Sequence, residues 1–193
     1  KNVASCKSLV GDVKETLERL LGRIGERSIS GWNGDIEAWK AEVPSAHGRD
    51  VELHPRFILE TIHGKVGDDA IVTTEVGQHQ MWTAQFYPFA KPRTFITSGG
   101  LGTMGFGTGA AMGAQVANPD RQVVHVAGDG SFRMNCAELA TISHYRLPIL
   151  IIVMNNGTLG MVRQWQTLFY KGRYSSTTLD RPPDFVKLAD AYG

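Results

Sequence analysis

The chain has 193 residues, and 20 lysines and arginines nearly balance 19 aspartates and glutamates, so the formal net charge is +1. This balance predicts neither binding to nucleic acid nor a basic membrane-binding surface. The longest apolar run, residues 147–154, is far shorter than the roughly 20 residues that cross a bilayer. Cys6 and Cys136 lie far apart without a CxxC pattern, which excludes a zinc ribbon and a disulfide scaffold. We expect a reducing compartment, either the cytoplasm of a bacterium or the stroma or matrix of an organelle.

The first residues in chain order predict one helix and an incomplete domain. The chain begins with Lys1 and ends directly after an amphipathic pattern, so we expect a fragment of a longer protein. Apolar residues recur at helical spacing from Val13 to Ile24, behind the capping pattern Asp12-x-x-Glu15, and therefore predict a helix.

The following segment predicts a domain boundary. Glycine and serine between residues 28 and 34 are expected to interrupt the helical pattern, and a short amphipathic segment follows at 36–43. Residues 44–50 are polar and contain proline and glycine, which is typical of a linker. We therefore divide the chain into residues 1–48, the end of one domain plus the linker, and residues 49–193, a second domain.

Beyond the linker, short apolar runs alternate with helical patterns. Pro55 is expected in the first turn of a helix. Parallel strands that are covered on both faces appear as unbroken apolar runs, so the pattern predicts an α/β fold with a mostly parallel sheet and helices on both faces. Strands are predicted at 70–74, 94–97, 122–127 and 149–154, and helices at 78–86, after a glycine-rich turn to about 117, and at 132–145.

The glycine-rich turn allows more than one interpretation. Gly100-x-Gly102-x-x-Gly105 lies between a predicted strand and a predicted helix. This arrangement resembles a dinucleotide fingerprint, in which Asp129 could bind a ribose hydroxyl. Another phosphate ligand, or close packing of a small-residue helix on the sheet, would explain the glycines equally well.

Polar residues at the ends of two later strands indicate a magnesium site. Gly128-Asp129-Gly130 follows the third strand, and Asn155-Asn156 follows the fourth. If these strands are neighbours, Asp129 and Asn156 emerge side by side at the carboxyl edge of the sheet. Their oxygens suit Mg²⁺, which completes its octahedron with phosphate and water. The flanking glycines would let the backbone approach phosphates, and Ser131 is expected to cap the next helix. Taken singly, these residues could equally be turn residues.

A Gly-Asp-Gly motif followed by Asn-Asn is the motif of thiamine diphosphate enzymes. Around it, the chain resembles the large, catalytic subunit of acetolactate synthase (acetohydroxyacid synthase) at residues 76–82, 98–107, 159–166 and 184–189. Residues 10–13 weakly resemble the end of the family's middle, FAD-type domain. The resemblance implies the thiamine diphosphate-binding fold, incomplete at its C-terminus and preceded by a short remnant of another α/β domain.

The resemblance also implies a role for each matching residue. Asp129, the Asn156 side chain and the Thr158 carbonyl would bind Mg²⁺. Met104 would take the catalytic position between the two rings of the cofactor, where it holds the bent form that brings the aminopyrimidine nitrogen to the thiazolium C2 proton. The other cofactor-binding residues would be Gln78, His79, Gly102, Gly128, Gly130, Ser131, Gly160 and Met161. The substrate side would be lined by Met161, Val162 and Trp165, with Trp165 favouring 2-ketobutyrate as acceptor.

The implied activity belongs to a larger protein. Pyruvate would be decarboxylated on thiamine diphosphate and joined to a second 2-keto acid, giving 2-acetolactate or 2-aceto-2-hydroxybutyrate for branched-chain amino acid synthesis. The family further implies FAD in the full-length protein, a homodimer with shared active sites or a tetramer, and a small regulatory subunit. Its activating carboxylate lies in another domain, so neither Glu75 nor Glu138 is assigned that role and the chain alone is expected to be inactive.

Alternatives stay open at this stage. A pyruvate oxidase or a 2-keto acid decarboxylase shares the motif, while a dehydrogenase domain or a non-catalytic binding module represents other classes. Met104 and Met161 could fill the core, Trp165 could be a buried or interface aromatic residue, and His79 could lie on a helix surface, as could His125. Thr108-Gly109 stands where the family commonly has Leu-Pro.

Overall fold

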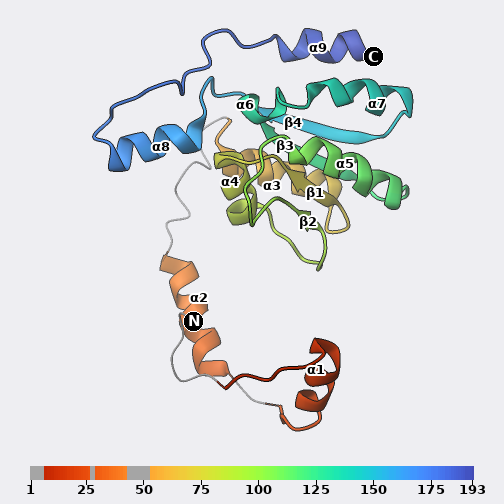
Figure 1. The fold of residues 1–193 in the computed structure, drawn as a ribbon, viewed down its shortest axis with the longest axis vertical. Helices are drawn as coiled ribbons and strands as arrows, with labels where there is room; N and C mark the ends of the chain where they lie inside the picture. The colour runs from red at the N-terminus through yellow and green to blue at the C-terminus, as the bar shows by residue number, and fades with distance from the viewer. Residues whose placement is uncertain (1–6, 27–28, 43–52) are drawn as a thin grey trace. The chain divides into compact units, whose positions relative to one another are not determined.

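The computed structural model describes residues 7–26, 29–42 and 53–193 (Figure 1). The chain divides into two units, Lys1–His47 and Gly48–Gly193. The assignment of the first part to an FAD-type domain stays a prediction, and the predicted linker at 44–50 lies outside the described residues. Cys136 is a free thiol, and Cys6 is also outside the described range.

Residues 7–26 and 29–42 of the first unit form two helices, and the second of them differs from expectation. Helix α1 (Val13–Leu21) begins after Asp12, whose side chain accepts a hydrogen bond from the backbone N–H of Glu15, as the capping pattern predicts. Helix α2 spans Ser30–Glu42, so the interruption expected as far as residue 34 and the later helix start expected at residue 36 are wrong, while residues 28 and 43 lie outside the described part of the chain. Trp32 and Trp39, two turns apart, pack edge to face with ring centroids 5.5 Å apart, a contact that stabilises the longer helix.

The second unit is built on a four-stranded parallel sheet, as predicted. The strands β1 (Ile71–Thr74), β2 (Phe95–Ile96), β3 (Val123–Gly128) and β4 (Ile149–Met154) lie in the order β2-β1-β3-β4. Strands β3 and β4 are direct neighbours, with Gly128 opposite Met154 at the carboxyl edge. The strand pairing therefore places the segments after β3 and β4 next to each other.

Helices connect and cover these strands. They are α3 (Pro55–Val66), α4 (Gln78–Phe86), α5 (Phe106–Ala117), α6 (Asp129–Phe132), the 3₁₀ turn η1 (Cys136–Glu138), α7 (Leu139–His144), α8 (Gly160–Phe169) and α9 (Phe185–Tyr192). None of the helices formed by residues 7–26, 29–42 and 53–193 is both long and apolar enough to cross a membrane.

The single helix predicted at 132–145 is wrong, because the crossover between β3 and β4 is broken into α6, η1 and α7. The backbone leaves the helical region at Asn135. The side-chain amide of Asn135 donates a hydrogen bond to the carbonyl of Gly105 in the glycine-rich turn. The break thus serves a long-range contact that the local pattern does not reveal.

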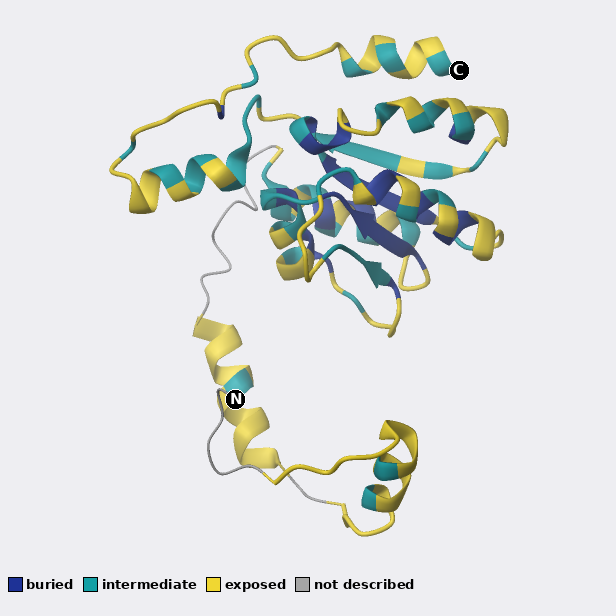
Figure 2. Cartoon of the chain, in the orientation of Figure 1, coloured by how far each residue is buried: buried dark blue, intermediate teal, exposed yellow. Residues whose placement is uncertain are grey.

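The two faces of the sheet carry separate cores. On one face, Val72, Val124 and Val126 pack with Leu59 of α3 and with Tyr87. On the other face, Ile71 of β1 and Val123 of β3 pack with Ala111 and Ala114 of α5. Figure 2 shows the buried residues gathered on β1 and β3, between the helices. Helices on both faces confirm the predicted α/β class.

Helix α5 approaches the sheet so closely that one position excludes a side chain. A Cβ at Gly107 would lie 2.7 Å from the carbonyl carbon of Thr74 and 2.7 Å from the backbone nitrogen of Glu75. Both atoms belong to the backbone and move little. At Gly107, close packing of a small-residue helix is therefore the reason for the glycine.

We expect Gly107→Ala to lower the free energy of unfolding by about 1–3 kcal/mol, because the added methyl group forces α5 away from β1. Gly109→Ala is the matched control in the same helix, since a Cβ there meets no atom within 4 Å. Alanine at 109 should raise the free energy by about 0.4–1 kcal/mol. Urea unfolding checks both changes, and equal effects at the two positions would contradict this account of the packing.

Candidate functional site

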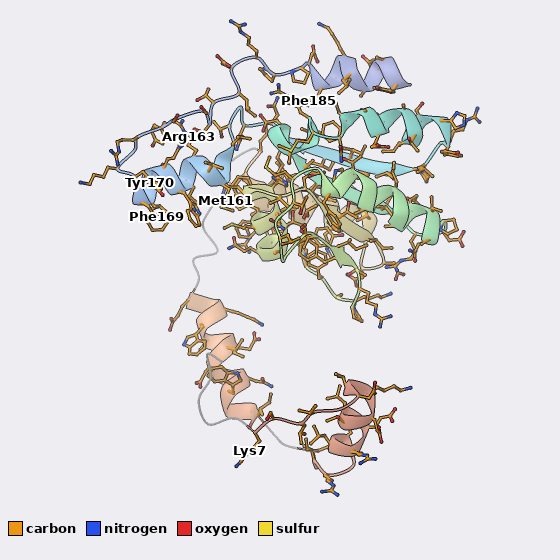
Figure 3. The ribbon with its side chains drawn as sticks, viewed as in Figure 1. Lys7, Met161, Arg163, Phe169, Tyr170 and Phe185 are labelled. Atoms are coloured by element: carbon orange, nitrogen blue, oxygen red, sulfur yellow. The ribbon has the colours of Figure 1, made fainter. Side chains whose placement is uncertain are left out.

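The carboxyl ends of β1, β3 and β4 border a cleft that brings most of the predicted site residues together. Its walls come from the start of α4, the glycine-rich turn, α6 and the start of α8. In Figure 3, the labelled Met161 lies at the end of α8 nearest the sheet. The predicted residues that line the cleft are Gln78, His79, Met104, Gly128, Asp129, Gly130, Ser131, Asn156, Thr158, Gly160, Met161 and Val162.

Two predicted site residues, Gly102 and Trp165, do not line this cleft. Gly102 lies in the glycine-rich turn with a φ of 64°. Trp165 is 57% exposed and packs edge to face on Phe169. It borders a second hollow along α8, which shares Met161 and Val162 with the cleft. Trp165 is therefore placed beside the cleft rather than in it.

Asp129 is the first residue of α6 and is only 1% exposed. Its Oδ2 accepts a hydrogen bond of 3.0 Å from the backbone N–H of Gly157, which follows β4. Burial raises the pKa of Asp129, while nearby backbone N–H groups, with Gly157 the largest of these effects, lower it. None of the ion pairs formed by residues 7–26, 29–42 and 53–193 includes Asp129. A buried carboxylate without a cationic side chain fits a metal ligand.

The other two predicted metal ligands lie in the turn after β4. The amide oxygen of Asn156 accepts hydrogen bonds from the backbone N–H and the hydroxyl of Thr158, at 3.0 and 3.1 Å. Because an amide oxygen has two lone pairs, a metal bound through Asn156 would replace one of these contacts. One carboxylate, one amide oxygen and one carbonyl are hard oxygen donors, and this set fits Mg²⁺. In the described part of the chain, no three His, Cys, Asp or Glu side chains converge on a common point.

His79 is buried in α4, so its interpretation as a helix-surface residue is wrong. The side chain is 5% exposed, and its Nε2 is a buried atom without a hydrogen-bond partner. Burial lowers the pKa of His79 to about 4, with the backbone carbonyl of Glu75 opposing this effect. The imidazole is therefore neutral near pH 7, and His79 would hold a phosphate by hydrogen bonding rather than by charge.

The glycines around the cleft make room for side chains of the protein itself. A Cβ at Gly128 would lie 2.7 Å from Nδ1 of His79, and one at Gly130 would collide with Leu159. Gly160 similarly gives space to Gln78, whose Nε2 donates a hydrogen bond of 2.9 Å to Gln164 Oε1. The structure thus shows a packing reason for these glycines, where we expected backbone contact with phosphates.

The expectation that Ser131 caps a helix is wrong. Helix α6 begins at Asp129, and its N-cap is Gly128 without a side-chain hydrogen bond. Because Ser131 lies inside the helix, its hydroxyl donates to the Gly128 carbonyl at 3.3 Å. Ser131 still lines the cleft.

Glu75 is a buried residue to which sequence reasoning gave no role. It follows β1 and is fully buried, and its carboxylate accepts hydrogen bonds from the backbone N–H groups of Gly105, Gly107 and Thr108 at the start of α5. The sequence did contain a signal for this role. Glu75 follows an apolar strand, and the later glycine-rich helix has no capping side chain of its own. The carboxylate occupies the position where a dinucleotide fingerprint would hold pyrophosphate, which counts against the dehydrogenase alternative.

His125 is also buried, which contradicts its expected place on a surface. It lies on β3 and contacts two hydroxyls, with Nδ1 2.9 Å from Thr73 Oγ1 and Nε2 3.3 Å from Thr108 Oγ1. Burial is the largest cause that lowers the pKa of His125 to about 4. The neutral ring donates through one nitrogen and accepts through the other, so it links β1 and α5 through β3.

Comparison with known proteins identifies the family to which the second unit belongs. Residues 75–193 match the family described as thiamine pyrophosphate enzyme, C-terminal TPP binding domain. Among solved structures, a thiamine diphosphate-dependent 4-hydroxybenzoylformate decarboxylase of Rhodococcus jostii RHA1 superposes with a TM-score of 0.66 and 32% sequence identity. That match covers 72% of this chain and 26% of the other.

Named acetolactate synthases are similar along nearly the whole chain. The isozyme 3 large subunit of Escherichia coli is 45% identical over all of this chain and 35% of the relative. The large subunit of Corynebacterium glutamicum is 47% identical over 96% of this chain and 31% of the relative. The chain thus spans about a third of the length of these relatives. The resemblance inferred from the sequence is confirmed.

The two buried histidines predict how stability depends on pH. Their pKa values in the folded protein are about 4, below the ordinary value near 6.5. The stability that they contribute is therefore fully present above about pH 6.5 and is lost as the pH falls towards 4, because only the unfolded chain takes up the protons.

We expect the free energy of unfolding of His125→Gln to fall less steeply than that of the wild type as the pH is lowered from 6.5 to 4. The difference in slope should correspond to about one proton taken up on unfolding. Urea unfolding across this range measures the slope. The control Gln115→Ala changes a buried, non-titrating side chain of α5, so it should lower stability without changing the slope. An unchanged slope in His125→Gln would refute the assignment.

Proposed function

The chain belongs to the thiamine pyrophosphate enzyme family, and we propose that it is the cofactor-binding part of an acetolactate synthase large subunit. The observation that carries this proposal is the buried Asp129 carboxylate. It has no cationic partner among the described ion pairs, and it lies in one cleft with Asn156, Thr158 and Met104. The pairing of β3 with β4 supports a common metal site for the segments that follow these two strands.

In this proposal, Asp129, Asn156 and the Thr158 carbonyl bind Mg²⁺, which in turn neutralises the diphosphate. His79 and Gln78 contribute hydrogen bonds from α4, and Met104 packs against the cofactor from the glycine-rich turn. Bound thiamine diphosphate would supply the electron sink that allows pyruvate to lose carbon dioxide. Met161, Val162 and Trp165 on α8 would contact the second 2-keto acid and exclude water.

The proposed products are 2-acetolactate from pyruvate and 2-aceto-2-hydroxybutyrate from 2-ketobutyrate, for branched-chain amino acid synthesis. We further propose FAD in the whole protein, a homodimer or tetramer with shared active sites, and a small regulatory subunit. The apolar side chains exposed along α8 support an incomplete site that another chain covers. They are Val162, Trp165, Leu168, Phe169 and Tyr170, and Figure 3 labels the last two at the end of α8 away from Met161.

A 2-keto acid decarboxylase is the second candidate function. The solved structure of a 4-hydroxybenzoylformate decarboxylase is 32% identical and has a related fold, which favours this candidate over other classes. Assay of the intact protein with pyruvate separates the two. Acetolactate formation supports the synthase, whereas acetaldehyde without acetolactate supports the decarboxylase.

Calorimetric titration of the intact protein with thiamine diphosphate, with and without Mg²⁺, tests the site, with NAD⁺ as the control ligand. We expect saturable heat only with Mg²⁺, and no heat in Asp129→Asn. The matched control Asp69→Asn changes an exposed carboxylate that pairs with Lys91, and it should bind as the wild type does. Binding of NAD⁺ but not of thiamine diphosphate would overturn the proposal.

Asp129→Asn should also separate stability from binding. Because burial raises the pKa of Asp129, its charged form opposes folding at pH values above that pKa, and the cost is relieved as the pH falls. Without ligands, we expect the variant to be at least as resistant to urea as the wild type near pH 7. With Mg²⁺ and cofactor at a hundred times the dissociation constant, only the wild type should gain about 2.7 kcal/mol. A large loss of stability in the ligand-free variant would indicate a structural role.

Trp165 is expected to set the choice of acceptor, since one additional methylene of substrate is worth about 1–3 kcal/mol in an apolar contact. We expect Trp165→Leu to lower the ratio of 2-aceto-2-hydroxybutyrate to 2-acetolactate roughly tenfold when both substrates compete. Phe169→Leu is the control, because Phe169 packs on Trp165 but does not border the hollow. A similar change of ratio in both variants would indicate loss of packing alone.

A further inference from the structure

We propose that Glu75 is a positioning residue, which fixes the glycine-rich turn so that Met104 stands in the cleft. The inference rests on the proposed function, because the position of Met104 affects the reaction only if the cofactor lies against it. Glu75 itself does not line the cleft. It would therefore act through the backbone that it holds rather than by touching the cofactor.

The two oxygens of the Glu75 carboxylate hold different parts of the chain. Oε2 accepts a hydrogen bond of 2.6 Å from the N–H of Gly105, and Oε1 accepts bonds from Gly107 at 2.8 Å and Thr108 at 3.2 Å. Gly105 is the N-cap of α5 and has no side chain of its own to satisfy these donors. A negative charge at a helix N-terminus is also favourable. Glu75 thus supplies, from 30 positions earlier, the cap that the local sequence lacks.

The bond to Gly105 acts directly on Met104. The N–H of Gly105 and the carbonyl of Met104 belong to the same planar peptide unit, so Glu75 fixes the orientation of that unit. On the other side, Asn135 donates to the Gly105 carbonyl. Gly105 has a φ of 88°, which a residue with a side chain adopts only under strain. The residue after Met104 is therefore held through both of its peptide groups.

Glu75→Gln tests the role of the second oxygen. Glutamine keeps one acceptor, which can serve Gly107 and Thr108, but its amide group would face the N–H of Gly105 as a second donor. The variant should therefore keep much of the α5 cap and release the peptide between Met104 and Gly105. A displacement of about 1 Å in a catalytic group costs up to roughly 100-fold in rate.

The experiment measures acetolactate formation by the intact enzyme at saturating thiamine diphosphate and Mg²⁺. We expect Glu75→Gln to lower kcat about 10- to 100-fold, with little change in the KM for pyruvate. Gln115→Ala is the control for a purely structural effect, because Gln115 anchors the other end of α5 through the carbonyls of Asn118 and Arg121. This control should lower Tm and leave kcat unchanged.

Asn135→Ala decides the question if Glu75→Gln does not fold, because it releases Gly105 from the more exposed side. A lower kcat at unchanged Tm supports the inference, and a wild-type kcat overturns it. If both variants fold, the double variant should lose less than the product of the two single losses, since both act through one residue.

The wild-type enzyme separates this inference from the proposed function. If it forms no acetolactate with thiamine diphosphate, the proposed function fails and this inference fails with it. If the wild type is active and both variants keep its kcat, only the role of Glu75 is refuted.

Discussion

The parallel pairing of β3 with β4 is the constraint on which the candidate site depends. It sets Gly128 opposite Met154. The segments that follow the two strands therefore leave the sheet side by side, and Asp129 accepts its hydrogen bond from the backbone N–H of Gly157. Because the carboxylate is buried there without a cation among the described ion pairs, its charge costs free energy until a ligand offsets it. The arrangement thus gives up some stability at the position where a metal would bind.

The second constraint is close packing against the backbone, which the glycines allow because they have no side chain. Gly107 brings α5 onto β1, while Gly128 leaves room for the ring of His79. These contacts bury neutral imidazoles and the Glu75 carboxylate behind the cleft, where hydroxyls and backbone N–H groups satisfy most of their polar atoms. The exception is Nε2 of His79. A rigid polar layer therefore supports the residues that face the cleft.

The sequence predicted the elements with strong periodicity and missed those that depend on distant contacts. The strand at 149–154 and the helix at 78–86 were predicted with their observed bounds, and for the strand the reason is an unbroken apolar run, which is a local property. The break at Asn135 was missed because it serves a bond to Gly105, 30 positions away. Helix α2 continues through Gly31 and Gly34, and the ring contact between Trp32 and Trp39 along it is a further interaction that the local pattern did not reveal.

The sequence by itself determined the α/β class and placed Asp129 and Asn156 at the ends of two strands, because apolar runs and motif spacing are local properties. That these two strands are neighbours was only a condition until the structure paired β3 with β4. Only the tertiary structure decided which side chains are buried, since burial depends on how elements pack. It placed His79 and His125 in the interior, moved Trp165 out of the cleft, and assigned Glu75 to the start of α5. A carboxylate becomes a helix cap only when folding brings a helix to it. A local sequence pattern does not indicate which distant segments come together.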